Sequence, residues 1–217
     1  MVSMVIASAG ILVSLITGLL LYKKLDPVWL RLFVYFLVVD FSVQLLGYLY
    51  SVRYHKSNHF IFNILIIIEF GFYFYIFSRA LHRRDFKRFV QILAIVFFLF
   101  AGYNLVFGES FFRFNQHTNS LGALALLIIC LLYFTESFMS ELSINFFRTP
   151  MFWITTGLFF YYAGNGIYLS LLSYILKNDL DRNGEIYLKM TVGLNVMLYA
   201  LFTIGFLCNQ EWKKRNS

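Results

Sequence analysis

The chain has 217 residues, of which 60% are hydrophobic, 21% are aromatic and only 13% are charged. A soluble domain averages about 25% charged residues, so this chain has too little polar surface to face water on all sides. The composition therefore excludes a soluble nucleic-acid-binding protein, although the net charge is +7. The basic residues cluster between apolar runs, where they set membrane orientation and meet lipid headgroups. We expect the lipid bilayer as a partner and no nucleic acid.

Seven stretches of the sequence reach the length of about 20 mostly apolar residues that a membrane-spanning helix needs. The connectors between them carry most of the charges and both prolines, Pro27 and Pro150, each just before a span. We predict an all-α membrane protein, a seven-transmembrane-helix bundle that forms a single domain over residues 1–217. The predicted spans run from Val2 to Tyr22, Trp29 to Ser51, Phe60 to Ala80, Phe89 to Phe107, Leu121 to Ser140, Met151 to Leu176 and Tyr187 to Cys208.

The distribution of Lys and Arg predicts the orientation of these spans. With the N-terminus outside, twelve of the 18 Lys and Arg residues fall on the cytoplasmic side and the other six fall on the outer side. Membrane proteins keep such an excess on the inside. Trp29, Trp153 and Trp212 then all lie at cytoplasmic ends of spans, where an aromatic belt is expected. We therefore predict an outer N-terminus, an uncleaved first span and a cytoplasmic C-terminus.

The second and third spans share features with the sixth and seventh. The second span starts with Pro27-Val28-Trp29, and the sixth span starts with the similar Pro150-Met151-Phe152-Trp153. Asp40 precedes Glu69 by 29 residues, and Asn165 precedes Asn195 by 30 residues. One interpretation is a three-plus-one-plus-three plan with a parallel internal repeat. The alternative is chance similarity, because apolar sequences align easily.

Four polar side chains lie near the middle of four different predicted spans. Asp40, Glu69, Asn165 and Asn195 each stand 8 to 11 residues from the predicted outer end of their span. At 1.5 Å per residue this depth is about 12 to 17 Å, in a hydrocarbon core about 30 Å thick. Polar side chains avoid lipid at this depth, so we predict that the four helices turn these faces inward to meet.

Helical spacing extends each of these residues into a polar stripe, because residues four apart share a face of a helix. The stripes form either a ligand-binding pocket or a hydrogen-bonded core, since Asn and Tyr also join membrane helices without any further function. The predicted ligand-binding residues are Asp40, Gln44, Glu69, Tyr73, Tyr161, Asn165, Tyr168, Asn195 and Tyr199, with Tyr48 and Asn104 extending the pocket outward.

The carboxylates are the strongest functional signal in the sequence. No Lys or Arg lies at the depth of Asp40 and Glu69, so a simple buried ion pair does not neutralise them. They are therefore protonated, hydrated through a cavity or neutralised by a bound cation. Glu136 differs because it lies near the cytoplasmic end of its span. There we expect a salt bridge to a basic loop residue such as Arg148.

The sequence contains no catalytic motif, and an intramembrane enzyme is the weakest functional hypothesis. It has no Gly-rich phosphate loop, no GxSxG elbow and no buried histidine set for a zinc hydrolase. His55, His59 and His117 lie in predicted outer loops, where they either share a surface metal or are solvated side chains; we expect the latter. Cys130 and Cys208 are predicted to be core residues. We predict no cofactor.

A dense basic patch occupies the third connector, with Arg83, Arg84, Lys87 and Arg88 inside six residues. Such clusters bind lipid headgroups and fix the orientation of a span. The same patch also has the charge to dock an acidic cytoplasmic signalling protein.

The segment PMFWITTGLFFYYAGNGIYLSLLSYIL, with LNVMLYALFTIGFLC after it, resembles a family of uncharacterised bacterial seven-helix integral membrane proteins. The resemblance covers the last two spans and implies a bacterial inner membrane but no known activity. Microbial rhodopsins are similar in the number of spans, but the seventh span lacks a mid-membrane lysine for retinal. Small three-plus-one-plus-three sugar carriers are also similar, although this chain lacks their proline-glutamine hinges.

Two functional hypotheses follow. The first is a sensor or signalling receptor subunit that binds a small polar or cationic ligand, or protons, in the midplane pocket and acts through a separate partner. The second is a small-solute carrier in which Asp40 and Glu69 couple transport to protons or cations. We favour the sensor, because the near-absence of prolines within the spans suits a compact bundle of unbroken helices.

Overall fold

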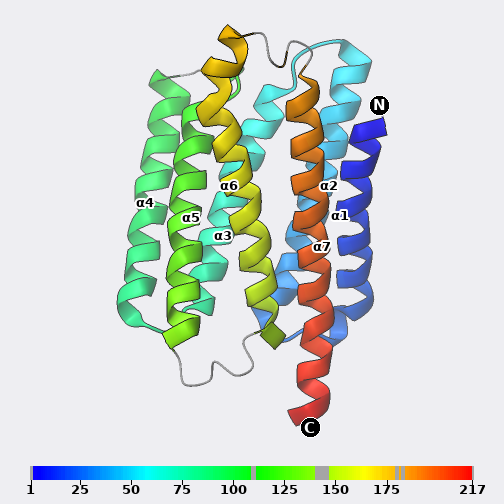
Figure 1. Cartoon of the computed structure of the whole chain (residues 1–217), viewed down its shortest axis with the longest axis vertical. Coiled ribbons are helices and arrows are strands. Elements are labelled where there is room, and N and C mark those ends of the chain that lie inside the picture. Colours follow the sequence, from blue (N-terminus) through cyan, green and yellow to red (C-terminus); the bar gives the residue numbers. More distant parts are fainter. Residues whose placement is uncertain (1, 109–110, 140–146, 179–180, 182–183, 217) are drawn as a thin grey trace. The chain divides into compact units, whose positions relative to one another are not determined.

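The computed structural model describes residues 2–108, 111–139, 147–178, 181 and 184–216, and within these ranges the regular structure is entirely helical. Figure 1 shows the helices as long rods. The all-α prediction is confirmed for the described part of the chain. The elements are α1 (Val2–Leu21), a 3-10 turn (Tyr22–Lys24), α2 (Val28–Tyr54), α3 (His59–Ala80), α4 (Arg84–Phe107), α5 (Gln116–Met139), α6 (Pro150–Lys177) and α7 (Glu185–Asn216).

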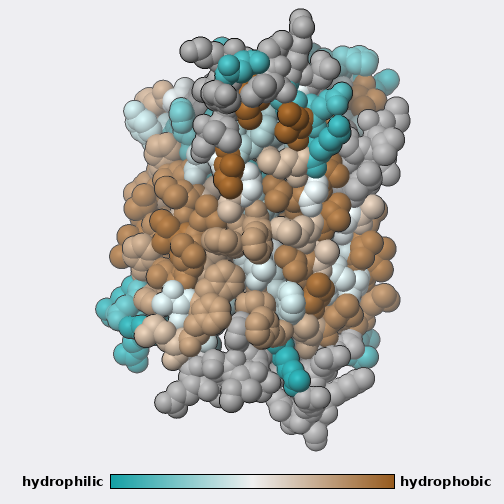
Figure 2. Space-filling model, viewed as in Figure 1, coloured by the Kyte–Doolittle hydropathy of each residue, from teal (hydrophilic) through white to brown (hydrophobic). Residues whose placement is uncertain are grey.

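Five of the described helices, α2 to α5 and α7, are long and apolar enough to cross a membrane. Their apolar segments are 22 to 27 residues long. At 1.5 Å per residue these segments are longer than the roughly 30 Å thickness of a hydrocarbon core. These helices indicate an integral membrane protein. Figure 2 shows apolar side chains over the left of the view, where α4 and α5 lie, with hydrophilic side chains at the lower end of α4.

The chain divides into two compact units, and each has its own helical core. One unit combines Met1–Asp26 with Glu141–Ser217 and contains α1, α6 and α7. The other unit, Pro27–Ser140, contains α2, α3, α4 and α5. The four-helix unit is therefore inserted in sequence between the first helix and the last two helices of the three-helix unit. The single domain expected from the sequence stays a prediction, as does the internal repeat.

In the three-helix unit, α7 packs against both α1 and α6. Glycines bring the backbones together at these contacts. A methyl group added at Gly164 of α6 would lie 2.7 Å from the side chain of Leu194 in α7. One added at Gly10 of α1 would lie 3.4 Å from the ring of Tyr199. Small residues at helix contacts are typical of membrane proteins, where close van der Waals packing holds helices together.

In the four-helix unit, α3 is the central element, because it packs against α2, α4 and α5. Phe70 of α3 is fully buried, and its ring centroid lies 5.2 Å from that of Phe97 in α4. On its other side Phe70 meets α5 at Gly122, where an added methyl group would lie 2.5 Å from the ring. The backbone of α5 therefore approaches α3 as closely as the Phe70 ring permits.

This packing predicts that Gly122→Ala destabilises the protein. The added methyl group meets a buried ring that Phe97 prevents from moving, and such overpacking costs about 1 to 3 kcal/mol. Gly102→Ala in α4 is the matched control, because nothing lies within 4 Å of the added methyl group there. We expect the control to melt at the wild-type temperature or above, since alanine favours helix over glycine. Equal melting temperatures for the two variants in detergent would contradict the α3–α5 contact.

Candidate functional site

Two contacts fix the register of α2 on α3, which run in opposite directions (Figure 1). The rings of Phe36 in α2 and Tyr73 in α3 have centroids 5.4 Å apart. Further along, the ring of Phe62 in α3 lies 3.0 Å from the position that a Cβ atom would take at Gly47 in α2. Eleven residues separate the two contacts on each helix. The register is therefore the same at both contacts, and positions between them pair in the same way.

Asp40 and Glu69 lie opposite each other in this register. Asp40 is one helical turn beyond Phe36, and Glu69 is one turn before Tyr73, so each stands on the face that carries the contact. Asp40 is only 7% exposed, and Glu69 is half-buried. Both residues are near the middle of their helices. The two residues therefore stand at one level of the α2–α3 interface, and we take this level as the candidate site.

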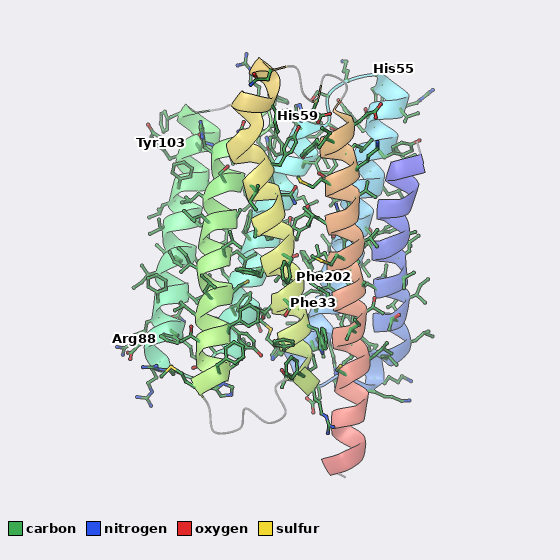
Figure 3. The ribbon with its side chains drawn as sticks, in the orientation of Figure 1. Phe33, His55, His59, Arg88, Tyr103 and Phe202 are labelled. Atoms are coloured by element: carbon green, nitrogen blue, oxygen red, sulfur yellow. The ribbon has the colours of Figure 1, made fainter. Side chains whose placement is uncertain are left out.

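The side chains around this site are an amide and a group of aromatic rings. Gln44, one turn beyond Asp40, donates a hydrogen bond of 2.9 Å from Nε2 to the Asp40 Oδ1 atom. On the other side, the rings of Phe36 and Phe72 stack with centroids 4.3 Å apart. Phe33, labelled in Figure 3, extends this aromatic group with a centroid 5.6 Å from that of Phe72. The site thus has a polar side and an apolar side.

Basic residues are far from the two carboxylates along the helices of this unit. The nearest ones in α2 are Arg31 and Arg53, nine and 13 residues from Asp40, and the nearest in α3 is Arg79, ten residues from Glu69. Nine residues of helix span about 13 Å. The Lys and Arg residues of α4 fall within its first five residues, and α5 contains none. Two ionised carboxylates at one level repel each other, so this arrangement suits a shared proton or a small cation.

The two predicted asparagines lie in the three-helix unit, and each bonds within its own helix. The Nδ2 atom of Asn165 donates to the carbonyl oxygen of Tyr161 at 3.0 Å, and that of Asn195 donates to the carbonyl oxygen of Thr191 at 2.9 Å. Both asparagines are half-buried. Bonds to a carbonyl four residues earlier are a common local solution for polar side chains in helices. Their convergence with Asp40 stays a prediction.

The remaining predicted tyrosines have packing roles in the same unit. The ring of Tyr161 meets Tyr162 edge to face, with centroids 5.1 Å apart. Tyr199 is buried and packs against Gly10 of α1. The hydroxyl of Tyr168 donates a hydrogen bond of 3.0 Å to Oδ2 of Asp181, in the connector before α7. Tyr168 therefore links α6 to the connector before α7.

Asp181 is a structural residue that the sequence analysis missed. Its carboxylate accepts the backbone N–H groups of Ile186 and Tyr187, each at 2.9 Å, in the first turn of α7. A carboxylate is favoured there, because the N–H groups at the start of a helix have no acceptor within the helix. Burial acts to raise the pKa of Asp181, but the N–H groups of Tyr187 and Ile186 and the Tyr168 hydroxyl together hold the pKa below its ordinary value. The available sequence signal was an aspartate shortly before a helix start, with Gly184 between them.

This lowered pKa predicts a pH-dependent effect of Asp181→Asn on stability. Because the carboxylate is more acidic in the folded protein, its contribution is fully present above the ordinary aspartate pKa of about 3.9. It is lost as the pH falls through the lower folded-state value. We expect the variant to melt below the wild type at pH 7, and the difference to vanish as the pH approaches the folded-state pKa.

Thermal unfolding of both proteins, followed by intrinsic fluorescence between pH 7 and pH 3, measures this difference. Glu185→Gln is the control, because Glu185 is an exposed acid at the start of the same helix and pairs only with Lys189 four residues on in the described structure. We expect the control to melt close to the wild type throughout. A difference for Asp181→Asn that stays constant down to pH 3 would contradict the proposed ionised cap.

Glu136 has backbone partners where the sequence analysis expected a basic side chain. Its carboxylate accepts the N–H groups of His82, at 2.9 Å, and of Arg83, in the connector between α3 and α4. The His82 Nδ1 atom lies 3.9 Å from Glu136 Oε2. Arg148, the expected partner, belongs to the other compact unit. The sharp corner before α4 leaves N–H groups without helical acceptors, and these provide the partners of the carboxylate.

Asn63 of α3 anchors the connector between α4 and α5. Its Nδ2 atom donates to the carbonyl oxygens of Phe111 and Arg113, at 2.8 and 2.7 Å. Its Oδ1 atom accepts the N–H group of Asn115 at 3.0 Å. Asn63 is 1% exposed, so these bonds replace water for a buried amide. Asn63 was not among the predicted site residues, although an asparagine within an apolar span is itself a sequence signal.

Asn104, expected to extend the midplane pocket, lies in the same group of bonds. Its Nδ2 atom donates to Oδ1 of Asn115 and to Oγ1 of Thr118, the latter at 3.1 Å. All of these residues are buried. Asn104 therefore joins α4 to the start of α5. These amide bonds tie three helices of the four-helix unit together at one end.

The loop histidines do not form a metal site in the described part of the chain, where no three His, Cys, Asp or Glu residues gather closely enough to hold an ion. His55 and His59, labelled in Figure 3, lie at the same end of the four-helix unit. Both are exposed, as is His117. His55 ends α2 in the left-handed backbone conformation, with a φ of 51°. A structural role at the end of a helix accounts for its position.

No protein-family model, curated protein or solved structure matches this chain. The resemblance to bacterial seven-helix membrane proteins stays a prediction. The functional conclusion therefore rests on the α2–α3 carboxylates and the chemistry around them.

Proposed function

We propose that this protein is a membrane sensor or receptor subunit that binds a proton or a small cation between Asp40 and Glu69. The observation that supports the proposal is the register of α2 on α3, which sets the two carboxylates opposite each other. Both helices are long and apolar enough to cross a membrane. Ionised carboxylates are costly to bury at such a depth, and two of them at one level also repel each other. A bound proton or cation removes that cost and the repulsion within the pair.

The proposed architecture has seven spans, with α1 and α6 added to the five helices that meet the length and composition criteria. The excess of Lys and Arg on one side gives the orientation, with the N-terminus outside and the C-terminus in the cytoplasm. The proposed location is a bacterial inner membrane. The binding site then lies near the middle of the bilayer.

Occupancy of the site changes the packing of α2 on α3 in this proposal. When the site is empty and both carboxylates are ionised, their repulsion favours separation of the two helices. When a proton or cation is bound, both carboxyl groups are attracted to it. The contact between Phe36 and Tyr73 is then favoured. A ligand shifts a conformational equilibrium only by its difference in affinity between the two states. The repulsion between the carboxylates supplies that difference in affinity. A separate protein partner then binds one of the two helix arrangements in preference to the other.

The continuity of the helices favours the sensor over the carrier. Carriers commonly bind their substrate where membrane helices are interrupted, because unwound backbone supplies ligands. In the described structure α2 and α3 run without a break through the positions of Asp40 and Glu69. A carrier that couples transport to these carboxylates is the alternative function.

The proposal predicts that the two carboxylates titrate as one coupled pair. In wild-type protein, infrared difference spectroscopy of the carboxylic acid band during a pH titration will show two linked steps from buried groups. Asp40→Asn or Glu69→Gln will leave a single step, because the remaining carboxyl group no longer has a charged neighbour. Asp85→Asn, at an exposed position in α4, is the control and will leave both steps. Independent titration of the two groups would contradict the proposal.

Cation binding is tested by the thermal stability of the protein in sodium or potassium chloride against choline chloride. A cation site predicts a higher melting temperature in the metal salts at neutral pH, and no such gain in the Asp40→Asn and Glu69→Gln double variant. A proton site predicts no difference between the salts and a gain only on acidification. Flux of protons or cations into liposomes that the double variant abolishes would replace the sensor with the carrier.

A further inference from the structure

The corner between α3 and α4 carries a cluster of basic side chains that make no ion pair with any carboxylate of the described chain. Two acids are near this basic corner in sequence or space. Asp85 is exposed beside it, and the carboxylate of Glu136 is occupied by backbone N–H groups. The basic corner consists of Arg79, Arg83, Arg84, Lys87 and Arg88.

The position of the basic corner places it at the surface of the bilayer. It joins α3, which ends at Ala80, to α4, which begins at Arg84, and both helices are long and apolar enough to span a membrane. A connector of three residues between two spans cannot leave the headgroup region. Figure 3 shows Arg88 at the lower end of α4, and Figure 2 shows hydrophilic atoms there beside apolar surface.

Contacts with α5 and with neighbouring aromatic rings set the conformation of the corner. Glu136 of α5 binds the N–H groups of His82 and Arg83, so the connector is tied to the four-helix unit. The guanidinium carbon of Arg83 lies 4.6 Å from the centroid of Phe86, and that of Arg79 lies 5.4 Å from the centroid of Tyr75. Stacking on a ring orients a guanidinium group while its N–H donors remain available at the edge.

Apolar side chains next to the corner indicate which anion it binds. Phe89 and Ile92, in the next turn of α4 toward the membrane centre, are 41% and 57% exposed. Tyr75 of α3, which underlies Arg79, is 39% exposed. A soluble acidic protein would reach the cations but not apolar groups at membrane depth. A phospholipid meets both, with its phosphate at the cations and its acyl chains along α4.

We propose that the basic corner binds the headgroup phosphate of an anionic phospholipid, with the acyl chains lying against Phe89 and Ile92. Arg84, Lys87 and Arg88 supply charge, and the guanidinium groups supply paired N–H donors that match phosphate oxygens. The interaction weakens as salt screens the charges. This inference does not depend on the carboxylate pair at Asp40 and Glu69.

The test uses the full chain in nanodiscs of phosphatidylcholine, with and without phosphatidylglycerol. Native mass spectrometry counts retained phosphatidylglycerol, and thermal unfolding gives the stabilisation that the anionic lipid provides. The test variant combines Arg84→Gln, Lys87→Gln and Arg88→Gln. The matched control combines Arg53→Gln, Lys56→Gln and Arg113→Gln, three exposed cations at the other end of the same unit.

We expect the wild type and the control to retain phosphatidylglycerol and to melt at a higher temperature in its presence. The corner variant will retain at least about tenfold less of the anionic lipid, since each cation near a lipid surface contributes to binding. It will lose the thermal gain. If the triple variant does not fold, two further measurements decide the question: Arg88→Gln alone, and a sodium chloride titration of the wild type. We expect the rise in melting temperature that phosphatidylglycerol gives to be smaller in Arg88→Gln and to fall as the salt concentration rises.

Three results would overturn the proposal. The first is an equal gain from phosphatidylglycerol in the wild type, the control and the corner variant, or a wild-type gain that high salt leaves unchanged. The second is the same stabilisation by inorganic phosphate in discs of phosphatidylcholine alone, which would assign the site to a soluble anion. The third is an acidic protein that binds through the corner without any lipid preference.

Discussion

The packing of α2 on α3 determines how the positions of Asp40 and Glu69 are paired across the two helices. The contact between Phe36 and Tyr73, repeated eleven residues away between Gly47 and Phe62, holds the two helices in one register. That register sets Asp40 opposite Glu69 in a region where the helices carry no basic residue. Two carboxylates so placed repel each other unless something positive lies between them. In the proposed function, this electrostatic interaction links binding to a change in helix packing.

The helices themselves could be predicted from the sequence, because a chain in lipid must satisfy its backbone hydrogen bonds within each span. The ends were predicted less well. The predicted fourth span begins at Phe89, whereas α4 begins at Arg84, and the predicted fifth span begins at Leu121, whereas α5 begins at Gln116. Hydropathy reports the apolar part of a helix, but the backbone bonds continue into the polar turns beyond it. The division into two compact units was not predicted from the sequence.

Within the candidate site, a shared level along the helices could be predicted, and the hydrogen-bond partners could not. Counting residues along a helix gave Asp40 and Glu69 the same level, and the α2–α3 contacts place them on facing sides. Glu136 and Asp181, by contrast, bind backbone N–H groups at the starts of helices, and those donors depend on how the connectors turn. Tyr168 and Asn104 likewise bond to connector residues or to the start of the next helix. Residue type alone does not distinguish such structural bonds from a binding site.

The most direct test of the account is a double-mutant cycle on the free energy of unfolding, measured in detergent for the wild type, Asp40→Asn, Glu69→Gln and the double variant. If the two side chains share one site, the effects will be non-additive, with a coupling of about 0.5 to 3 kcal/mol, as for residues in contact. Effects that add to within about 0.5 kcal/mol, as for distant residues, would show that the carboxylates do not meet and would remove the proposed site.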